Sequence, residues 1–185
     1  MCIRDSLKGV LKNDAAALTL PEKVSLIGDI QALTGNGMMP LGSALALAPA
    51  LARDPDRQVV SKTMSITTGL QDNLTEPILL PKYRQYLADV YGKRARQLGW
   101  TARPNDSDDD RLLRPTLADV LANQAEEPES ISEAKRLALA WFDDHKAVGP
   151  DMVGTVLEAA ARHGDRDLFD RMRAAAKLEK DEQIQ

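Results

Sequence analysis

The 185-residue sequence is poor in several residue types on which particular folds and sites depend. It has one cysteine, Cys2, so no disulfide can form within the chain and cysteine usage indicates no redox compartment. Aromatic residues make up only 4% of the chain, which fits packed helices more easily than a β-sandwich or barrel. No apolar run approaches the ~20 residues that a transmembrane helix requires. The composition therefore favours helices and predicts no transmembrane span.

The chain also lacks an excess of positive charge, since its formal net charge is −4. Nucleic acids and anionic membranes attract cationic surfaces, so this balance argues against either as a main partner. Hydrophobic residues make up 43% of the sequence and charged residues 28%, which is typical of a globular domain with a core. The sequence does not indicate a cellular compartment.

Patterns of the common catalytic and metal sites are missing as well. The two histidines, His145 and His163, lie 18 positions apart, and neither belongs to a His-Glu-x-x-His motif. Each falls near the expected C-terminal end of a helix, where a protonated imidazole suits the helix dipole. Residues 35–37 (Gly-Asn-Gly) follow a predicted helix rather than a strand, so they do not indicate a phosphate-binding loop. The sequence therefore predicts no catalytic residue and no metal site.

What the sequence does contain is a succession of helix signals. Apolar residues recur at spacings of three and four, and Pro or Gly separates one such stretch from the next. Thr19 followed by Glu22 has the spacing of a capping box, and Asp54 followed by Pro55 indicates a helix start. Helices are predicted over about residues 20–34, 40–53, 55–70, 81–98, 111–121, 131–142, 150–163 and 165–172.

Details within this pattern give further expectations. Pro49 is expected to kink the second predicted helix, because proline has no N–H to donate. Ser130 and Glu133 have the spacing of a second capping box. Met38 and Met39 are expected to fill gaps in the core, since methionine adapts to irregular spaces.

No stretch of alternating apolar and polar residues indicates a strand, so the predicted fold is all-α. Helices of this length, joined by short Gly/Pro turns, fit stacked antiparallel pairs as in a HEAT- or armadillo-like α-solenoid, although no sequence repeat is evident. Residues 7–185 are expected to form a single partial helical domain, with the polar connection 101–110 as a candidate joint. The first six residues, Met-Cys-Ile-Arg-Asp-Ser, match a translated transposon end used in sequencing libraries. We therefore expect residues 1–6 to be a non-native scar.

Residues 108–115 combine the features of a candidate anion site. The three aspartates that open this stretch face the positive end of the predicted helix dipole. Arg111 and Arg114 are three residues apart, which predicts that they share one helix face. Pro115 predicts that the helix either starts late, near Arg111, or is kinked. Two arginines beside a free carbonyl would hold a carboxylate, while a capped helix with solvated arginines explains the same pattern.

Several motifs together resemble the C-terminal helical domain of M1-family zinc aminopeptidases, in the puromycin-sensitive and endoplasmic-reticulum branch and in a bacterial form. Each is weak alone, but their order and spacing are those of the family, and the resemblance runs from about residue 15 to the end. The motifs are residues 18–23 (Leu-Thr-Leu-Pro-Glu-Lys) with Asp29, residues 97–100 (Gln-Leu-Gly-Trp), residues 112–114 (Leu-Leu-Arg), the helix 134–141 and residues 162–165 (Arg-His-Gly-Asp).

The resemblance implies an all-α bowl that covers a zinc-binding catalytic domain and encloses a cavity for peptides. The zinc ligands and the exopeptidase motif would lie in that preceding domain, so this fragment is not expected to be a peptidase by itself. The implied partners are the parent catalytic domain and peptide substrates. Residues 180–185 look like an interrupted end, and the stripe of Leu168, Met172 and Leu178 is then expected to be exposed.

In some members of that family, an arginine at the position of Arg114 helps to bind the far end of a peptide. The resemblance therefore makes Arg114 a candidate substrate-binding residue and gives Arg111 no role. Pro115 departs from the uninterrupted helix that the family has there. Two other functions are compatible with the residues themselves: a free-standing helical-repeat scaffold that binds a protein partner, and a small enzyme whose site is assembled from scattered residues.

Overall fold

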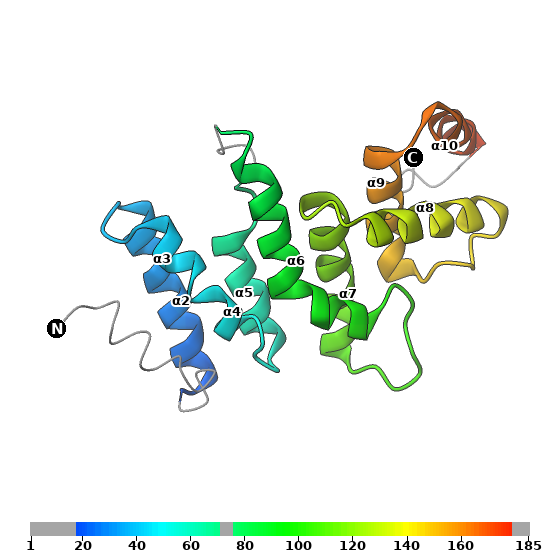
Figure 1. Ribbon diagram of the computed structural model, residues 1–185. Coiled ribbons are helices and arrows are strands. Elements are labelled where there is room, and N and C mark those ends of the chain that lie inside the picture. The colour runs from blue at the N-terminus through cyan, green and yellow to red at the C-terminus, as the bar shows by residue number, and fades with distance from the viewer. Residues whose placement is uncertain (1–17, 71–75, 179–185) are drawn as a thin grey trace. The chain divides into compact units, whose positions relative to one another are not determined.

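The computed structural model of the protein describes residues 18–70 and 76–178 (Figure 1). These residues form helices and no strand, which confirms the all-α prediction. The predictions for residues 1–6 and 180–185 lie outside the described residues. In chain order the helices are α2 (Leu20–Gly35), α3 (Leu41–Leu45), α4 (Ala48–Leu51), α5 (Arg57–Thr67), α6 (Leu79–Leu98), α7 (Asp108–Asp119), the π-helix η2 (Val120–Gln124), α8 (Pro128–Asp143), α9 (Pro150–His163) and α10 (Arg166–Leu178).

The chain divides into two compact units, residues 1–94 (unit 1) and 95–185 (unit 2). The boundary falls inside α6, between Arg94 and Ala95. The candidate joint at residues 101–110 comprises most of the connection from α6 to α7 and the first residues of α7, so it belongs to unit 2. Among the helices of the described residues, none is both long and apolar enough to cross a membrane.

In unit 1, α2 begins at the predicted capping box. The Glu22 carboxylate accepts hydrogen bonds from the hydroxyl and the backbone N–H of Thr19, at 2.7 and 2.8 Å, and these bonds lower the pKa of Glu22. The apolar face of α2 packs against α5 and α3. The core of unit 1 contains Ile27, Ile30, Met39, Ala44, Leu47, Leu51, Val59 and Ile66. Met39 therefore fills the core as predicted, whereas Met38 is 75% exposed and the prediction for it was wrong.

The helix predicted over residues 40–53 is broken into α3 and α4 rather than kinked. Pro49 lies in the first turn of α4, and its missing N–H leaves the carbonyl of Leu45, four residues earlier, without a helical donor. The hydroxyl of Tyr86, on α6, donates to this carbonyl at 2.8 Å. A side chain from a distant helix thus satisfies the backbone group that the proline leaves free.

The start of α5 also differs from the prediction. Asp56 is the N-cap, and its carboxylate accepts from the backbone N–H of Gln58 at 2.7 Å. Asp54, which we expected to cap this helix, is only 3% exposed, and its carboxylate accepts from the backbone N–H of Asp56 at 2.9 Å. The Asp-Pro pair therefore lies in the turn before the helix, and Asp54 does not cap α5.

Two tyrosines of α6 close the C-terminal end of α5. The Tyr91 hydroxyl lies 2.6 Å from Oγ1 of Thr67, and the Tyr83 hydroxyl donates to the Thr67 carbonyl at 2.8 Å. Burial raises the pKa of Tyr91 well above its ordinary value, so the phenol stays neutral. These bonds fix α6 against α5 within unit 1.

In unit 2, α9 packs against both α8 and α7. Gly149 is the N-cap of α9 and Pro150 occupies its first turn, as predicted from the Gly-Pro pair. The apolar stripes expected on α8 and α9 lie in the core, which contains Ala118, Leu137, Ala138, Trp141, Val148, Met152, Val156, Ala160 and Leu168.

The capping box predicted at the start of α8 does not form. The helix begins at Pro128 with Glu127 as N-cap, three residues before the predicted position. The Ser130 hydroxyl donates to the Glu127 carboxylate at 2.6 Å. Glu133 accepts from Arg136 at 2.7 and 2.8 Å, and this side-chain bonding lowers the pKa of Glu133. A proline in the first turn, which needs no N–H partner there, decides where the helix begins.

The prediction of an exposed stripe on α10 was wrong for Leu168. Leu168 is 7% exposed and belongs to the core, and Met172 is half-buried against that core. Phe169, the next residue along α10, is 55% exposed. The side chain of Leu178 lies outside the described residues.

Candidate functional site

The aspartate run in residues 108–115 forms the first turn of α7. Ser107 is the N-cap: its hydroxyl accepts from the backbone N–H of Asp110 at 3.1 Å and donates to the Asp110 carboxylate at 2.8 Å. This is a capping box that the sequence analysis missed, because an aspartate occupies the place where glutamate or glutamine is usual. Of the two alternatives given for Pro115, the late start near Arg111 was wrong, since the helix begins at Asp108.

The proline inside α7 does not end the helix. Pro115 removes the donor to the carbonyl of Arg111, and the helix continues to Asp119 before its hydrogen bonding widens into η2. In η2 the backbone N–H of Ala125 bonds to the carbonyl of Val120, five residues earlier. Such π-turns inside a helical run are often found at functional sites, so this segment is a reason to look closely at its neighbours.

The two arginines of the stretch are placed differently. Arg114 is 2% exposed, whereas Arg111 is exposed. Residues three apart on an α-helix differ by about 60° around its axis, which is enough to put one in the core and the other in solvent. The predicted shared face was therefore wrong, and the expectation that Arg111 is a surface charge is confirmed.

The guanidinium of Arg114 is bound from the connection between α6 and α7. Its Nη2 forms an ion pair with the Asp106 carboxylate, and its Nε donates to the carbonyl of Leu98, the last residue of α6, at 3.4 Å. The Asp106 carboxylate also accepts from the backbone N–H of Arg103 at 2.5 Å. The Arg103 N–H first, and then the Arg114 guanidinium, hold the pKa of Asp106 below its ordinary value.

The sequence made Arg114 a candidate to hold the carboxylate of a ligand. In the structure, the carboxylate that Arg114 holds is that of Asp106. A buried guanidinium forms strong, charge-assisted hydrogen bonds with a carboxylate. Asp106 was not identified from the sequence, because nothing in the polar connection marks which of its acidic residues turns inward. The turn that positions it, Arg103 to Asp106, was visible only as a Pro-containing loop.

A cavity of about 220 Å³ opens between the end of α6 and the start of α8. Trp100 lines it together with Arg96, whose Nη1 pairs with the Glu127 carboxylate at 2.7 Å. Glu129 and Glu133 also line it, so its polar groups are mostly acidic. The position of this cavity reflects Gly99, whose φ of +66° turns the chain sharply after α6.

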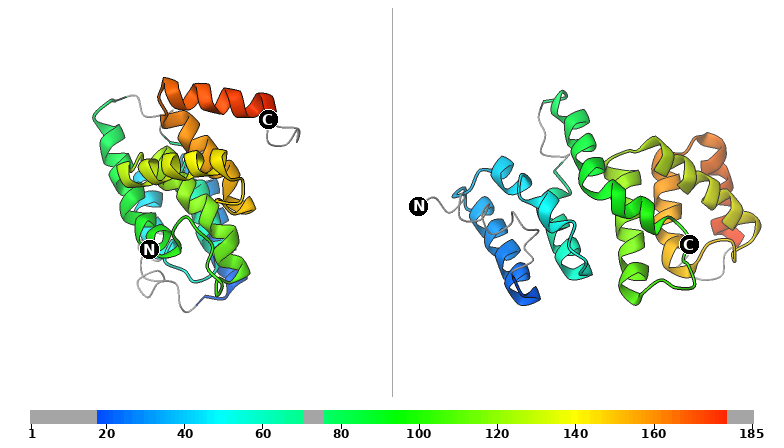
Figure 2. Two further views of the ribbon diagram at one scale, coloured as in Figure 1. Left: turned by 90° about the vertical axis from the view of Figure 1, so that its right-hand side faces the viewer. Right: turned by 60° about the horizontal axis from the view of Figure 1, so that its bottom comes forward.

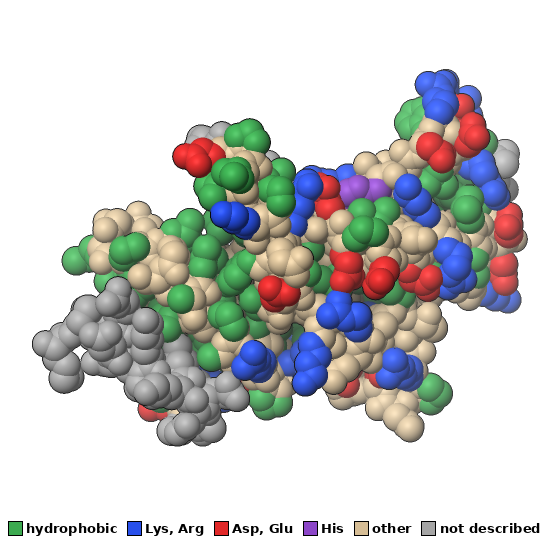
Figure 3. Space-filling model, viewed as in Figure 1, with side chains coloured by type: hydrophobic (Ala, Val, Ile, Leu, Met, Phe, Trp, Pro, Cys, Tyr) green, Lys and Arg blue, Asp and Glu red, His purple; other side chains and the backbone are tan. Residues whose placement is uncertain are grey.

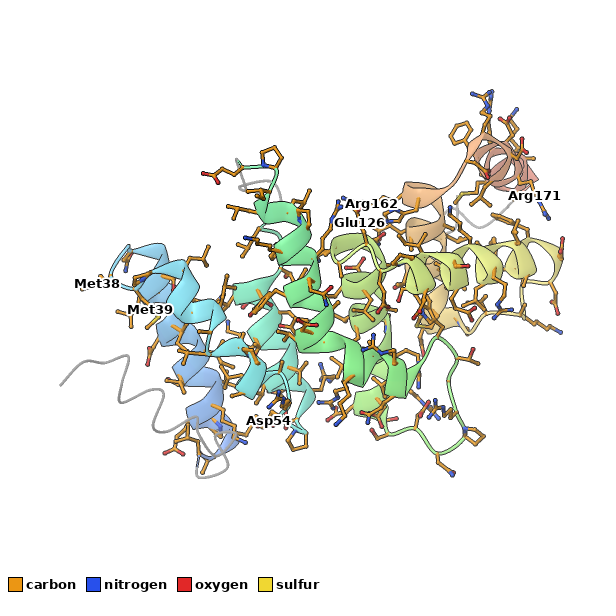
Figure 4. All side chains as sticks on the ribbon, in the orientation of Figure 1. Met38, Met39, Asp54, Glu126, Arg162 and Arg171 are labelled. Carbon is orange, nitrogen blue, oxygen red and sulfur yellow. The ribbon has the colours of Figure 1, made fainter. Side chains whose placement is uncertain are left out.

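The two histidines lie at helix ends, as expected. His163 closes α9, and its imidazole bonds to the backbone at Ala122 in η2, while Nε2 is buried with no hydrogen-bond partner among the described residues. Burial lowers the pKa of His163, with Glu126 opposing and Arg162 adding to the shift; both are labelled in Figure 4. His145 stacks on Trp141, with ring centroids 4.1 Å apart. Within residues 18–70 and 76–178, no group of three or more His, Cys, Asp or Glu side chains could hold a metal ion.

Unit 1 contains a second buried ionic cluster that the sequence analysis did not identify. Nζ of Lys23, on α2, lies 2.6 Å from the carboxylate of Asp54, which is labelled in Figure 4 in the loop between α4 and α5. Arg94, on α6, donates to the backbone carbonyl of Asp54 and to that of Pro55, the latter at 3.0 Å. Lys23, Asp54 and Arg94 all have partners within this cluster. The cluster therefore joins helices and leaves no charged group of the three available to a ligand.

Comparison with known proteins gives a family match over residues 4–185, to the ERAP1-like C-terminal domain. Aminopeptidase 2 of Candida albicans is 26% identical over 163 residues, which are 84% of this chain and 17% of that protein. Aminopeptidase M1-D of Oryza sativa is 29% identical over 79% of the chain and 17% of its own length. Aminopeptidase M1-C of the same plant is 28% identical over 76% of the chain and 16% of its own length. The chain thus spans about a sixth of the curated relatives it matches.

Proposed function

The chain belongs to the family of ERAP1-like C-terminal domains, and from this premise we propose that it is the substrate-enclosing helical part of a longer M1-type zinc aminopeptidase. The longer protein would remove N-terminal residues from peptides. The observation that carries the proposal is the family match over residues 4–185, which is nearly the whole chain. The aminopeptidase names of the relatives, each matched over a small part of its length, support it.

In this proposal the zinc and the residues that cleave the peptide belong to a catalytic domain outside the chain. The described residues do not fit a zinc site, so no catalytic step is assigned to them. The task of the chain is physical: to pack on its catalytic domain, to wall off a cavity that admits peptides but not folded proteins, and to keep water from a bound peptide. The catalytic domain and the peptide are then its two partners.

We extend the proposal to the architecture. Stacked antiparallel helix pairs, as in a HEAT- or armadillo-like solenoid, would give a single partial domain over residues 7–185. Packing of successive helices within unit 2, α8 on α9 and α9 on α10, supports such a stack. A bacterial parent, with residues 1–6 as a scar, is part of the same proposal, although the family match begins at residue 4. Resequencing this gene from genomic DNA tests both points.

At Arg114 the proposed chemistry is capture of a peptide carboxylate. The guanidinium already binds one carboxylate, that of Asp106, so a substrate would have to displace or share it. Because Arg114 is 2% exposed, such binding requires the Asp106 connection to move. A substrate role thus predicts that longer peptides bind with a conformational step at residues 99–107.

Arg114→Ala in the full-length parent tests that role. Weaker binding of longer peptides, with single-residue aminoacyl reporters cleaved as before, would support carboxylate capture. Equal losses for both substrate types, or a loss of thermal stability alone, would assign Arg114 to structure. Arg111→Ala is the matched control, because Arg111 lies on the same helix but is exposed.

The function itself is tested by recovering the complete gene. We expect an open frame that contains a His-Glu-x-x-His motif before this chain, and a protein whose peptide hydrolysis stops when zinc is chelated. Deleting residues 18–178 from that protein should reduce selectivity for peptides over folded proteins while leaving the zinc bound. A complete frame without a zinc motif would refute the proposal.

A further inference from the structure

A largely apolar groove of about 530 Å³ opens among α8, α9 and α10, entirely within unit 2. Figure 2 shows these three helices from two directions. The floor of the groove is aromatic: the rings of Trp141 and His145 are stacked, with an interplanar angle of 3°, and the Phe142 ring meets Trp141 edge-on at 5.7 Å. This volume lies in the range of small-molecule sites, and the groove is larger than the 220 Å³ cavity.

The walls add flexible apolar surface. Leu157 comes from α9, and Met172 and Phe169 come from α10. Phe169 is 55% exposed, and the guanidinium of Arg166 lies over its ring, 5.6 Å from the ring centroid. Met172 is half-buried, and an unbranched methionine can adjust to ligands of different shape. A ligand with an apolar side chain would therefore bury surface that is now wet.

Two opposite charges also line the groove, one on each wall. Glu158 lies on α9 and Arg173 on α10, and both are exposed. Neither forms an ion pair or side-chain hydrogen bond with the residues the structure describes. Three other charged residues of α10 are paired: Arg166 with Asp170 at 3.0 Å, and Arg171 with Asp143 of α8 at 2.9 Å. Figure 3 shows the mixture of acidic and basic side chains on one face of this unit.

We propose that this groove binds a small zwitterion with a large apolar side chain, such as a free amino acid or a dipeptide. Its carboxylate would bind Arg173 and its ammonium group would bind Glu158. Its side chain would lie among the apolar side chains of the groove, beside Leu157 and Met172. A ligand with a single charge would satisfy only one wall, and glycine would leave the apolar surface of the groove bare. This site lies apart from Arg114 and does not depend on the zinc chemistry proposed for the parent.

Binding can be measured by the fluorescence of Trp141, because Trp141 lines the groove while the other tryptophan, Trp100, lines the smaller cavity. In a Trp100→Phe variant of the 185-residue chain, the emission excited at 295 nm reports on Trp141 alone. We expect L-leucine or leucyl-leucine to change this emission saturably, with a Kd of about 1 mM, as suits so small a ligand. Saturation by both would indicate amino acids in general, and saturation by leucyl-leucine alone would indicate short peptides.

Blocked ligands separate this site from simple hydrophobic binding. Leucinamide lacks the carboxylate and N-acetyl-leucine lacks the ammonium group, so each should bind about tenfold more weakly than leucine. Arg173→Gln should weaken leucine binding by a similar factor and should abolish the preference over leucinamide. Lys177→Gln is the matched control, since Lys177 is an exposed cation of the same helix that does not line the groove.

Two further variants keep the test decisive. Glu158→Gln should abolish the preference for leucine over N-acetyl-leucine, and Ala161→Phe should fill the groove and remove all binding. Far-ultraviolet circular dichroism and a thermal melt establish that each variant is folded before it is titrated. Absence of a saturable signal with both leucine and leucyl-leucine would overturn the proposal. So would binding of the saturating ligand that is no tighter than binding of its amide, or equal effects of Arg173→Gln and Lys177→Gln.

Discussion

Each unit contains a buried ion pair between a helix and a loop, but the two pairs span very different lengths of chain. In unit 1, Lys23 binds Asp54 at 2.6 Å across 31 residues, and Arg94 reaches the Asp54 carbonyl across 40. In unit 2, Arg114 binds Asp106, only eight residues earlier. The first cluster joins α2, the loop before α5 and α6, whereas the second folds a loop back onto the helix that follows it.

The difference predicts unequal consequences for similar chemistry. A charge pair between distant segments holds helices in place, so removing it affects the packing of the unit as well as the pair itself. A pair between a helix and its own preceding loop fixes mainly that loop. In both cases, breaking a buried pair by removing one partner is more harmful than the pair is favourable, because the other charge loses its partner.

The largest effect should come from Asp54→Ala. It leaves Lys23, which is 14% exposed, without its carboxylate, and it removes the acceptor of the Asp56 N–H. We expect unit 1 to lose about 3 kcal/mol of unfolding free energy. Hydrogen exchange followed by mass spectrometry should show faster exchange in α2 and α5 and unchanged exchange in α8 and α9. Asp29→Asn, at an exposed position of α2, is the control, and similar exchange in both variants would refute the structural role of Asp54.

A smaller and more local effect is expected from Arg114→Leu. Leucine keeps apolar bulk in the core. It leaves Asp106 with the hydrogen bond from the Arg103 N–H but without the ion pair. We expect a loss of about 2 kcal/mol in unit 2, as for one unsatisfied polar group. Exchange should increase most in residues 99–107. If α2 and α5 changed equally, the pair would not be local and the comparison between the units would fail.

The stability of unit 2 should depend on pH through Asp106, the acidic partner of Arg114. The pKa of Asp106 is lowered in the folded state, so its contribution is fully present above the unfolded value of 3.8 and is lost as the pH falls through the lower, folded value. Asp106→Asn should therefore destabilise the protein at pH 7. The difference from the unmodified chain should shrink below about pH 4. Urea unfolding at several pH values measures it, and a difference independent of pH down to about 2 would refute the shift.

Local features of the fold were predictable because their causes lie within a few residues. The Thr19–Glu22 box and the Gly149-Pro150 helix start depend on neighbours in sequence, and both form as predicted. The break at Pro49 and the start of α8 at Pro128 were each misjudged, although the proline itself was visible. At Pro49 a hydrogen bond from Tyr86 of α6 satisfies the carbonyl that the break leaves free, whereas at α8 the proline in the first turn sets the start ahead of the predicted capping box.

The candidate site was less predictable. That Arg114 is buried and Arg111 exposed depends on which way α7 rotates against α9, which no short motif specifies. The partner of Arg114 lies in the loop before α7, next to three further aspartates in the first turn of that helix, and only the folded turn selects Asp106. The substrate role of Arg114 stays a prediction, since the structure describes its internal partners and not a bound peptide.

The smallest effects, and the sharpest control on the comparison, are expected at the two capping boxes. Thr19 caps α2 through Glu22 in unit 1, and Ser107 caps α7 through Asp110 in unit 2. Both boxes are local and exposed, so Thr19→Ala and Ser107→Ala should each remove about 1 kcal/mol.

Equal losses of unfolding free energy in the two capping variants would show that a capping box contributes equally to the stability of both units. The difference between Asp54→Ala and Arg114→Leu would then be due to the length of chain that each buried pair joins. If Ser107→Ala instead destabilised unit 2 as much as Arg114→Leu does, the cap and the ion pair would act as one unit at the start of α7. A double variant decides this, because losses from independent sites add, whereas coupled losses fall short of their sum.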